Sequence, residues 1–341
     1  MYNNVISSKS VWRLIILFLC KWLCENIEVM KDRFNREIDY LRISVTDLCD
    51  LRCKYCMPEK GVEKLNHEDI LKPEQIYEIV KSFASLGIKK VRITGGEPLV
   101  RKGIEEIIRY IRSIPEIEEI CLTTNGIKLK EKAKILKESG VDRLNISLDT
   151  LEENKYHDLT RVGHLKDVLE GIEEAKKVGF QNIKINTVLI GGFNDDEINS
   201  FIDFAATNKI TVRFIELMPI GESKNMPSNS FVSNELVKQN ERLEFFKEDG
   251  VSSLYKIKGS DSYIGLISPL SNRFCKDCNR VRLTADGKIK PCLHSKEEID
   301  ISKLHGEDLK EALVQAINSK PKQHHLEKGS KALRGMNMIG G

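Results

Sequence analysis

The sequence predicts an α/β fold: a partial (βα)6 barrel of the TIM type, followed by a carboxyl-terminal α+β extension. Short β-branched runs alternate with amphipathic stretches from Tyr40 onward, and six such units in series predict a parallel sheet with right-handed crossovers. Each predicted strand ends in a polar or glycine-rich loop, as in a barrel whose active site faces one way. An open dinucleotide-binding sheet fits less well, because no G-x-G-x-x-G follows the first strand.

The elements of the barrel follow from the spacing of apolar residues. Six strands are predicted at residues 40–46, 89–94, 117–122, 142–147, 182–190 and 210–217. The clearest helix follows Pro73; its apolar residues recur at three- and four-residue spacing, and a glycine comes just after it: Ile76, Ile79, Val80, Phe83, Leu86, then Gly87. Further helices are predicted at about 103–113, 128–138, 152–160, 166–178 and 195–207.

The strand–helix alternation stops after about residue 230. A short helix near 234–242 precedes antiparallel-looking strands near 251–257 and 263–267, a hairpin that turns at Asp286-Gly287, and a helix near 307–318. We therefore divide the chain into an amino-terminal extension over 1–29, a barrel domain over 30–230 and a carboxyl-terminal domain over 231–341.

Composition excludes several classes of protein. The 341 residues are 40% hydrophobic, which is enough for a substantial core, and 54 basic against 51 acidic residues leave a net charge of only +3. That excess does not indicate a nucleic-acid or membrane-binding protein. Nine cysteines, an odd number, without a visible signal peptide argue against a secreted disulfide framework and predict a cytoplasmic protein with reduced thiols.

Residues 1–29 do not fit the barrel pattern. The apolar run from Leu14 to Cys20 is bracketed by Arg13 and Lys21 and falls well short of the roughly 20 residues that a membrane-spanning helix needs. An interfacial anchor is one interpretation. We favour another, in which Met30 is the biological start and the preceding residues are an extension that does not pack.

Three cysteines, Cys49, Cys53 and Cys56, lie within eight residues directly after the first strand. A closed structural zinc site needs four ligands, so a zinc interpretation requires His67 or a carboxylate as the fourth. A four-iron cluster held by three cysteines instead leaves one iron open. The spacing C-x3-C-x2-C resembles the signature of the radical S-adenosylmethionine superfamily, whose cluster binds and cleaves that cofactor.

This resemblance implies further cofactor contacts. Tyr55 matches an aromatic position that lies against the adenine, and Gly96 belongs to a Gly-Gly-Glu-Pro motif whose backbone binds the methionyl ammonium. Ser147 after the fourth strand and Met218 after the sixth match positions that also contact S-adenosylmethionine in similar proteins.

A second triplet, Cys275-x2-Cys278-x13-Cys292, lies in the carboxyl-terminal region. By spacing alone it fits a Cys3His zinc site completed by His294 as well as it fits an iron–sulfur site. Arg280 and Arg282 alternate on a predicted strand beside it, so both guanidiniums can point to one side and pair with an anion such as a triphosphate. A solvated hairpin face is the plainer interpretation of these arginines.

From about Tyr40 to Gly341 the chain resembles the GTP 3′,8-cyclase family, which catalyses the first step of molybdenum cofactor biosynthesis. The matching stretches are DYLRISVTDLCDLRCKYCMP, VRITGGEPLVR, LTTNG, RLNISLD, VRFIELMP, FCKDCNRVRLTADGKIKPCL and the terminal Gly-Gly. The resemblance implies two [4Fe–4S] clusters, S-adenosylmethionine, and GTP as the substrate that is converted to (8S)-3′,8-cyclo-7,8-dihydroguanosine 5′-triphosphate.

The same resemblance implies the substrate contacts and the partners. The residues that match GTP contacts are Arg42, Arg92, Thr123, Lys184, Arg280 and Arg282, with Arg213 as a further member of the phosphate pocket. Gly340 and Gly341 match a tail that threads into the active site. The expected partners are a one-electron donor of the flavodoxin or ferredoxin type, a downstream cyclic pyranopterin monophosphate synthase and a second copy of the chain in a homodimer.

Two rival functions remain. A radical peptide-modifying enzyme with an auxiliary cluster typically carries more carboxyl-terminal cysteines than the three present here. A zinc-based nucleic-acid binder could use both triplets and the stretch Lys320-Pro321-Lys322 with His324 and His325, but it needs a charge excess and leaves Gly-Gly-Glu-Pro unexplained. We expect this Lys/His stretch to be a surface segment or part of the tail.

Overall fold

The computed structural model describes residues 29–62, 65–66, 68–324, 326 and 334–339. The predicted extension, apart from Val29, lies outside these residues, as do His67, His325, Gly340 and Gly341. In the described part of the chain, no helix combines the length and the apolar character needed to cross a bilayer.

Six parallel strands form the centre of the structure, and they follow one another in the sheet in chain order. They are β1 Tyr40–Ser44, β2 Lys90–Thr94, β3 Glu119–Thr124, β4 Arg143–Ser147, β5 Ile183–Leu189 and β6 Thr211–Glu216. Each predicted strand is present, with ends within two residues of the predicted ones. The partial barrel is therefore confirmed.

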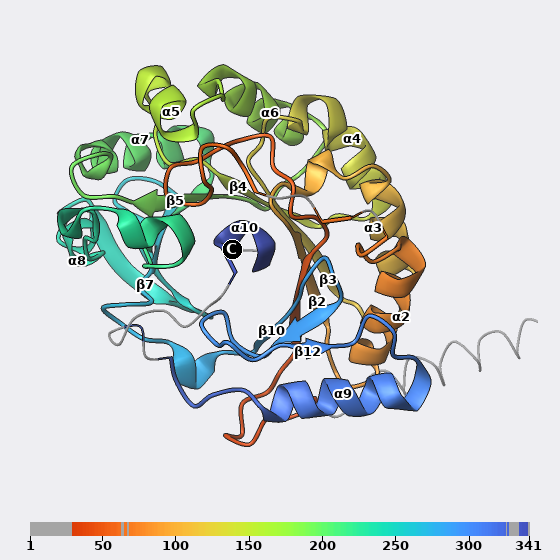
Figure 1. The fold of residues 1–341 in the computed structure, drawn as a ribbon. Helices are drawn as coiled ribbons and strands as arrows, with labels where there is room; N and C mark the ends of the chain where they lie inside the picture. Colours follow the sequence, from red (N-terminus) through yellow and green to blue (C-terminus); the bar gives the residue numbers. More distant parts are fainter. Residues whose placement is uncertain (1–28, 63–64, 67, 325, 327–333, 340–341) are drawn as a thin grey trace, which may run out of the picture.

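Helices cover the outside of this curved sheet (Figure 1). They are α2 Pro73–Ala84, α3 Ile104–Arg112, α4 Leu129–Ser139, α5 Glu153–Thr160, α6 Leu165–Lys177 and α7 Ile198–Asn208. Each predicted helix is found; α7 begins three residues later than predicted, because Asp195–Glu197 form a 3-10 turn before it. Other 3-10 turns span Pro98–Val100, Gly221–Asn225, Ser228–Ser230 and Cys275–Asp277.

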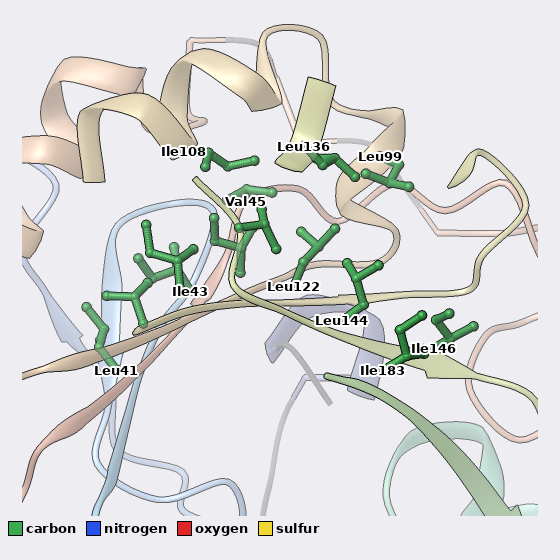
Figure 2. Packing of buried hydrophobic residues seen from close by; sticks show 14 of the residues in the cluster. Leu41, Ile43, Val45, Leu99, Ile108, Leu122, Leu136, Leu144, Ile146 and Ile183 are labelled. Carbon is green, nitrogen blue, oxygen red and sulfur yellow. The ribbon is translucent and has the colours of Figure 1, made fainter. Parts of the chain in front are cut away.

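The core lies between the sheet and these helices (Figure 2). Leu41 and Ile43 on β1 are fully buried and pack in the same cluster as Ile108 of α3 and Leu136 of α4. Because alternate residues of a strand point to opposite faces, the residues between them, such as Arg42, face the interior of the ring. The fold thus leaves the concave face of the sheet free for polar side chains.

The carboxyl-terminal region extends the same sheet at both edges of the barrel. Its elements are α8 Glu235–Lys238, β7 Leu243–Asp249, β8 Ser252–Ile257, β9 Tyr263–Ile267, β10 Arg280–Leu283, β11 Lys288–Lys290, β12 Ile299–Asp300, α9 Gly306–Asn318 and α10 Met336–Ile339. β9 pairs in parallel with β6, and β10 pairs in parallel with β1, which gives a continuous sheet of 12 strands.

Three features of this region differ from the prediction. The strands near 251–257 and 263–267 are antiparallel to each other, as expected, but their parallel connection to the barrel was not foreseen. The helix predicted over 234–242 is a single turn that ends at Lys238, because β7 begins at Leu243. The short helix α10 was not predicted, and it lies within the ring of strands (Figure 1).

Candidate active site

Two adjoining cavities occupy the interior of the ring, and both predicted cysteine triplets line them. The first cavity is lined by Cys49, Cys53 and Cys56 together with Tyr55, Gly96, Ser147 and Met218, which are the residues predicted to contact S-adenosylmethionine. The second is lined by Cys275, Cys278 and Cys292 and by Arg42, Arg92, Arg213, Arg280 and Arg282. Thr123, Asn186, Ile215, Met218 and Met336 line both cavities and so form their common boundary.

The loop after β1 turns tightly around the first triplet. The backbone N–H groups of Cys56 and Met57 both donate to the carbonyl of Cys53, at 2.9 and 3.0 Å. Arg161 donates to the carbonyl of Arg52 at 2.6 Å, and so ties the loop to the end of α5. The three thiols form no disulfide and share one cavity, an arrangement compatible with a cluster that takes one thiolate on each of three irons.

The Gly-Gly-Glu-Pro loop is bonded to this cysteine loop through its backbone. Gly96 donates to the carbonyl of Thr46 at 2.8 Å, and Glu97 donates to that of Leu48 at 2.7 Å. A Cβ atom on Gly96 would lie 2.7 Å from the carbonyl oxygen of Asp47 and still closer to that of Leu48. Only glycine therefore permits this approach, and its backbone remains open towards the first cavity.

Two buried carboxylates of the first cavity were not assigned by the sequence analysis. Glu97 accepts hydrogen bonds from the backbone of Leu99 and Asn125 and from Thr124, and burial raises its pKa to about 7. Asp149 accepts a hydrogen bond from the Tyr55 hydroxyl at 2.8 Å, and burial raises its pKa to about 6. The signal was present in the motifs Gly-Gly-Glu-Pro and Ser-Leu-Asp, in which only Gly96 and Ser147 were assigned roles.

A row of arginines crosses the floor of the second cavity because the strands that carry them are in register. Arg42 of β1 is paired with Arg282 of β10 on one side and with Arg92 of β2 on the other. Burial, followed by repulsion from Arg282 and Arg92, holds the pKa of Arg42 well below its usual value. Burial and Arg280 lower the pKa of Arg282 to about 10. Such crowded, buried cations favour the binding of an anion.

Thr123 lies at the junction of the two cavities, where its hydroxyl accepts a hydrogen bond from Arg92 at 3.1 Å. Lys184 is the one predicted GTP contact that does not line either cavity. Its ammonium pairs with Asp249 at 3.3 Å, and Arg213 pairs with the same carboxylate at 3.1 Å. Burial and the charge of Arg213 lower the pKa of Lys184 to about 8. Its role towards a substrate stays a prediction.

The second triplet is surrounded by positive charge. Burial raises the pKa of the Cys278 thiol, but Lys320 and Arg280 outweigh it and hold that pKa below its usual value. Of our two expectations for the Lys/His stretch, the surface segment is wrong for Lys320 and His324, which are 2% and 8% exposed, and a part in the tail stays a prediction. Burial was missed because the stretch has no apolar periodicity.

His294, the fourth ligand of the zinc alternative, also lines the second cavity, and its ring lies 4.7 Å from that of His324. Among the described residues, no three His, Cys, Asp or Glu side chains converge as the ligands of a single metal ion would.

The helix α10 lies against both cavities. Met336 lines each of them, and the amide of Asn337 donates to the carbonyl of Asp47 at 3.4 Å. Arg282 donates to the carbonyl of Ile339 at 3.1 Å. Arg334, before the helix, forms paired hydrogen bonds with Asp286 at 2.8 and 2.9 Å and with Glu298 at 2.9 and 3.0 Å. The segment that leads to Gly340 and Gly341 is thus directed into the interior, while these two glycines lie outside the described residues.

Comparison with known proteins agrees with this geometry. Residues 43–205 match the Radical SAM superfamily, and residues 210–326 match the family Molybdenum Cofactor Synthesis C. The chain is 50% identical to GTP 3′,8-cyclase of Alkaliphilus oremlandii over 92% of its own length and 100% of the relative's. It is 45% identical to GTP 3′,8-cyclase of Thermodesulfovibrio yellowstonii, with the same coverage of both chains.

Solved structures of low sequence identity share the fold. Streptococcus suis SuiB bound to S-adenosylmethionine superposes with a TM-score of 0.60 at 16% identity, over 93% of this chain and 75% of SuiB. The structure of anSMEcpe with bound AdoMet gives a TM-score of 0.58 at 17% identity, over 86% of each chain. The fold is therefore that of the radical S-adenosylmethionine enzymes, and, by its identity to the curated relatives over nearly their whole length, the chain belongs to the GTP 3′,8-cyclase family.

Proposed function

We propose that this protein converts GTP to (8S)-3′,8-cyclo-7,8-dihydroguanosine 5′-triphosphate, the first step of molybdenum cofactor biosynthesis. One observation carries the proposal beyond the relatives' name: the two cavities, one with the first thiol triplet and one with the arginine row, meet at Thr123, Asn186 and Met218. A cofactor held in the first cavity would therefore meet, at this common boundary, the nucleoside of a triphosphate that is held in the second cavity.

In the first cavity, Cys49, Cys53 and Cys56 would hold a [4Fe–4S] cluster. When bound, this cluster supplies the electron that cleaves S-adenosylmethionine into methionine and a 5′-deoxyadenosyl radical. The protein's part is to orient and to exclude water: the backbone at Gly96 offers polar groups to the methionyl end, and Tyr55 is fixed by its hydrogen bond to Asp149. Ser147 and Met218 line the same cavity and complete the proposed cofactor contacts.

In the second cavity, the arginines would bind the triphosphate. Planar guanidiniums pair bidentately with phosphate oxygens, and several are already placed side by side by the strand register. The proposed contacts are Arg42, Arg92, Thr123, Lys184, Arg280 and Arg282, with Arg213 beside them. Contact of Lys184 with a phosphate requires that it exchange its present partner, Asp249.

We propose a second [4Fe–4S] cluster on Cys275, Cys278 and Cys292. Its support is the chemistry of the donor set: three free thiols line the second cavity, and the pKa of Cys278 is held low by neighbouring cations, which favours a thiolate. These cysteines line the same cavity as the arginines, so a cluster held by them would be available to bind the guanine base. The row of buried arginines in this cavity favours a triphosphate over the peptide substrate of the rival peptide-modifying enzyme.

The clustered thiols suit the reducing cytoplasm. The reaction needs a one-electron donor of the flavodoxin or ferredoxin type, and its product would be consumed by a cyclic pyranopterin monophosphate synthase. We further propose a homodimer, domain limits at 30–230 and 231–341, and a role in turnover for Gly340 and Gly341.

The test is anaerobic reconstitution followed by iron counting and product analysis. Two clusters require about eight irons per chain. Incubation with dithionite, S-adenosylmethionine and GTP should give 5′-deoxyadenosine and the cyclised nucleotide, whereas Cys53→Ala should abolish cleavage. Cofactor cleavage that no nucleotide stimulates, with no cyclised product, would refute the proposed function.

A further inference from the structure

Two lysines are completely buried in the described part of the chain, and they differ in how their charge is balanced. Lys290 is 0% exposed and forms an ion pair with Glu298 at 3.0 Å. Lys320 is 2% exposed and forms no ion pair with a carboxylate among the described residues, and the charge of Asp32, which also acts on it, is already paired with Arg36. A buried ammonium without a counter-charge is strongly unfavourable, so the surroundings of Lys320 need an explanation.

The Lys320 ammonium donates to three acceptors, all in the walls of the second cysteine site. The carbonyl of Arg280 lies at 2.5 Å, the carbonyl of Pro291 at 2.9 Å and the Sγ atom of Cys278 at 3.9 Å. These three acceptors account for its three N–H donors. Pro291 precedes Cys292, and Arg280 follows Cys278 by two residues, so one side chain joins the two segments that carry these thiols.

A second cation holds the neighbouring backbone in place. Arg36 donates to the carbonyl of Cys275 at 2.8 Å and to the carbonyl of Pro321 at 2.8 Å, and it is paired with Asp32 at 2.6 Å. The residue after Lys320 is therefore tied to the third cysteine-bearing segment. This arrangement keeps the ammonium at a fixed position beside the thiol of Cys278.

We infer that Lys320 is the counter-ion of the second cluster: a positioning residue that orients the loops of Cys278 and Cys292 and makes the cluster easier to reduce. The inference rests on the second cluster of the proposed function. The negative charge that Lys320 lacks is supplied when the thiols bind iron as thiolates, and a donor to a cluster sulfur favours the more negative, reduced state.

The test compares variants of the intact holoenzyme. Lys320→Met removes the charge and all donors, Lys320→Gln keeps a neutral donor, and Lys320→Arg keeps the charge. Lys322→Met is the matched control, because the side chain of Lys322 is exposed and only its backbone carbonyl is used, by Arg36. The readouts are the midpoint potential of each cluster, followed by electron paramagnetic resonance, and the chelator concentration that removes iron. The first cluster, identified by its response to S-adenosylmethionine, is the internal reference.

We expect the second-cluster potential to become more negative in the Met and Gln variants and to be restored in Lys320→Arg. Its iron should be lost at about 10- to 100-fold lower chelator concentration, the usual effect of removing a residue that supports a metal ligand. If Lys320→Met does not fold, the Gln and Arg variants still differ in charge with a donor retained.

The outcomes separate the inference from the proposed function. Wild-type protein with only about four irons per chain would refute the second cluster itself. Two clusters in the wild type, with an unchanged second-cluster potential in both the Met and the Gln variants, would overturn the role of Lys320 alone. A shift of both clusters together, or an equal shift in Lys322→Met, would also overturn it.

Discussion

Replacing Gly96 by alanine tests whether close contact between two loops builds the first cavity. The added Cβ atom would lie 2.7 Å from the carbonyl oxygen of Asp47, whereas ordinary contacts begin at 3.4 Å. To restore an ordinary contact, the loop ahead of Cys49 must move by about 0.7 Å, and the carbonyl of Leu48, which is closer still, must move further. Overpacking of this kind costs about 1–3 kcal/mol of stability.

The displacement reaches the proposed cluster ligands directly, because Leu48 precedes Cys49 and its carbonyl accepts the hydrogen bond of Glu97. A misplacement approaching 1 Å in a positioned site lowers rates on the order of 10- to 100-fold. We expect Gly96→Ala to lose that much of its rate of S-adenosylmethionine cleavage, and part of its iron. Cleavage is measured as 5′-deoxyadenosine formed in the presence of dithionite, and stability is measured by urea unfolding.

Gly179→Ala is the control for a general loss of stability. Gly179 has a φ of 89°, so alanine there is strained by about 1–2 kcal/mol, yet its Cβ would meet no atom within 4 Å. This variant should be destabilised to a similar degree and still cleave the cofactor at the wild-type rate. Wild-type cleavage and iron content in Gly96→Ala would refute the argument that this contact shapes the site.

Three further predictions follow from other parts of the structure. Arg282→Ala should weaken GTP binding about 10- to 100-fold, which corresponds to the loss of about 1.5–3 kcal/mol for a charged hydrogen bond. Cofactor cleavage without GTP turnover should remain measurable in this variant. An unchanged GTP affinity in equilibrium dialysis would contradict the proposed substrate site. Asp32→Asn should lower stability by about 3–5 kcal/mol, because it leaves the Arg36 charge buried and unpaired. Burial raises the pKa of Asp32, but its hydrogen bonds and the charge of Arg36 outweigh burial, so the folded pKa is lowered. The difference in stability between wild type and Asp32→Asn should therefore be full above the usual aspartate pKa of 3.8 and disappear as the pH falls through the lower folded value. Urea unfolding of both proteins at pH 7, 5 and 3 tests the direction of this pH dependence. Arg334→Met removes the ion pairs with Asp286 and Glu298, so it should release α10 and increase the rate of proteolytic cleavage there about tenfold or more. An unchanged cleavage rate would show that these contacts do not hold the helix.

The barrel could be predicted because each of its elements carries a local signal. The apolar periodicity of α2 and the alternation on β5 depend only on neighbouring residues, and both elements are found as predicted. The cysteine spacings have the same local character. They separated the cysteines into the same two groups that line the two cavities: Cys49, Cys53 and Cys56 in the first, and Cys275, Cys278 and Cys292 in the second.

What could not be predicted depends on contacts between distant segments. Strand β9 is a short apolar run, and nothing in that pattern selects β6 as its parallel partner. Lys320 lies in a polar stretch without periodicity, and its burial depends on carbonyl groups 29 and 40 residues away in the chain. Asp249 was missed for the same reason, because its two partners lie on β5 and β6.

The parallel pairing of β10 with β1 has a consequence for how the activity is divided along the chain. Arg42 and Arg92 come from the barrel, whereas Arg280 and Arg282 come from the carboxyl-terminal region, and the register of the strands joins them into one row. The barrel alone would expose the edge of β1 and present only part of this row. The first cavity, by contrast, draws its cysteines and its Gly-Gly-Glu-Pro loop from the barrel. On the proposed function, the thiols and the loop for cofactor cleavage therefore come from the first two-thirds of the chain, with Met336 and Asn337 added from α10. The choice of an anionic nucleotide as substrate would then depend on the strands that close against the edges of the barrel.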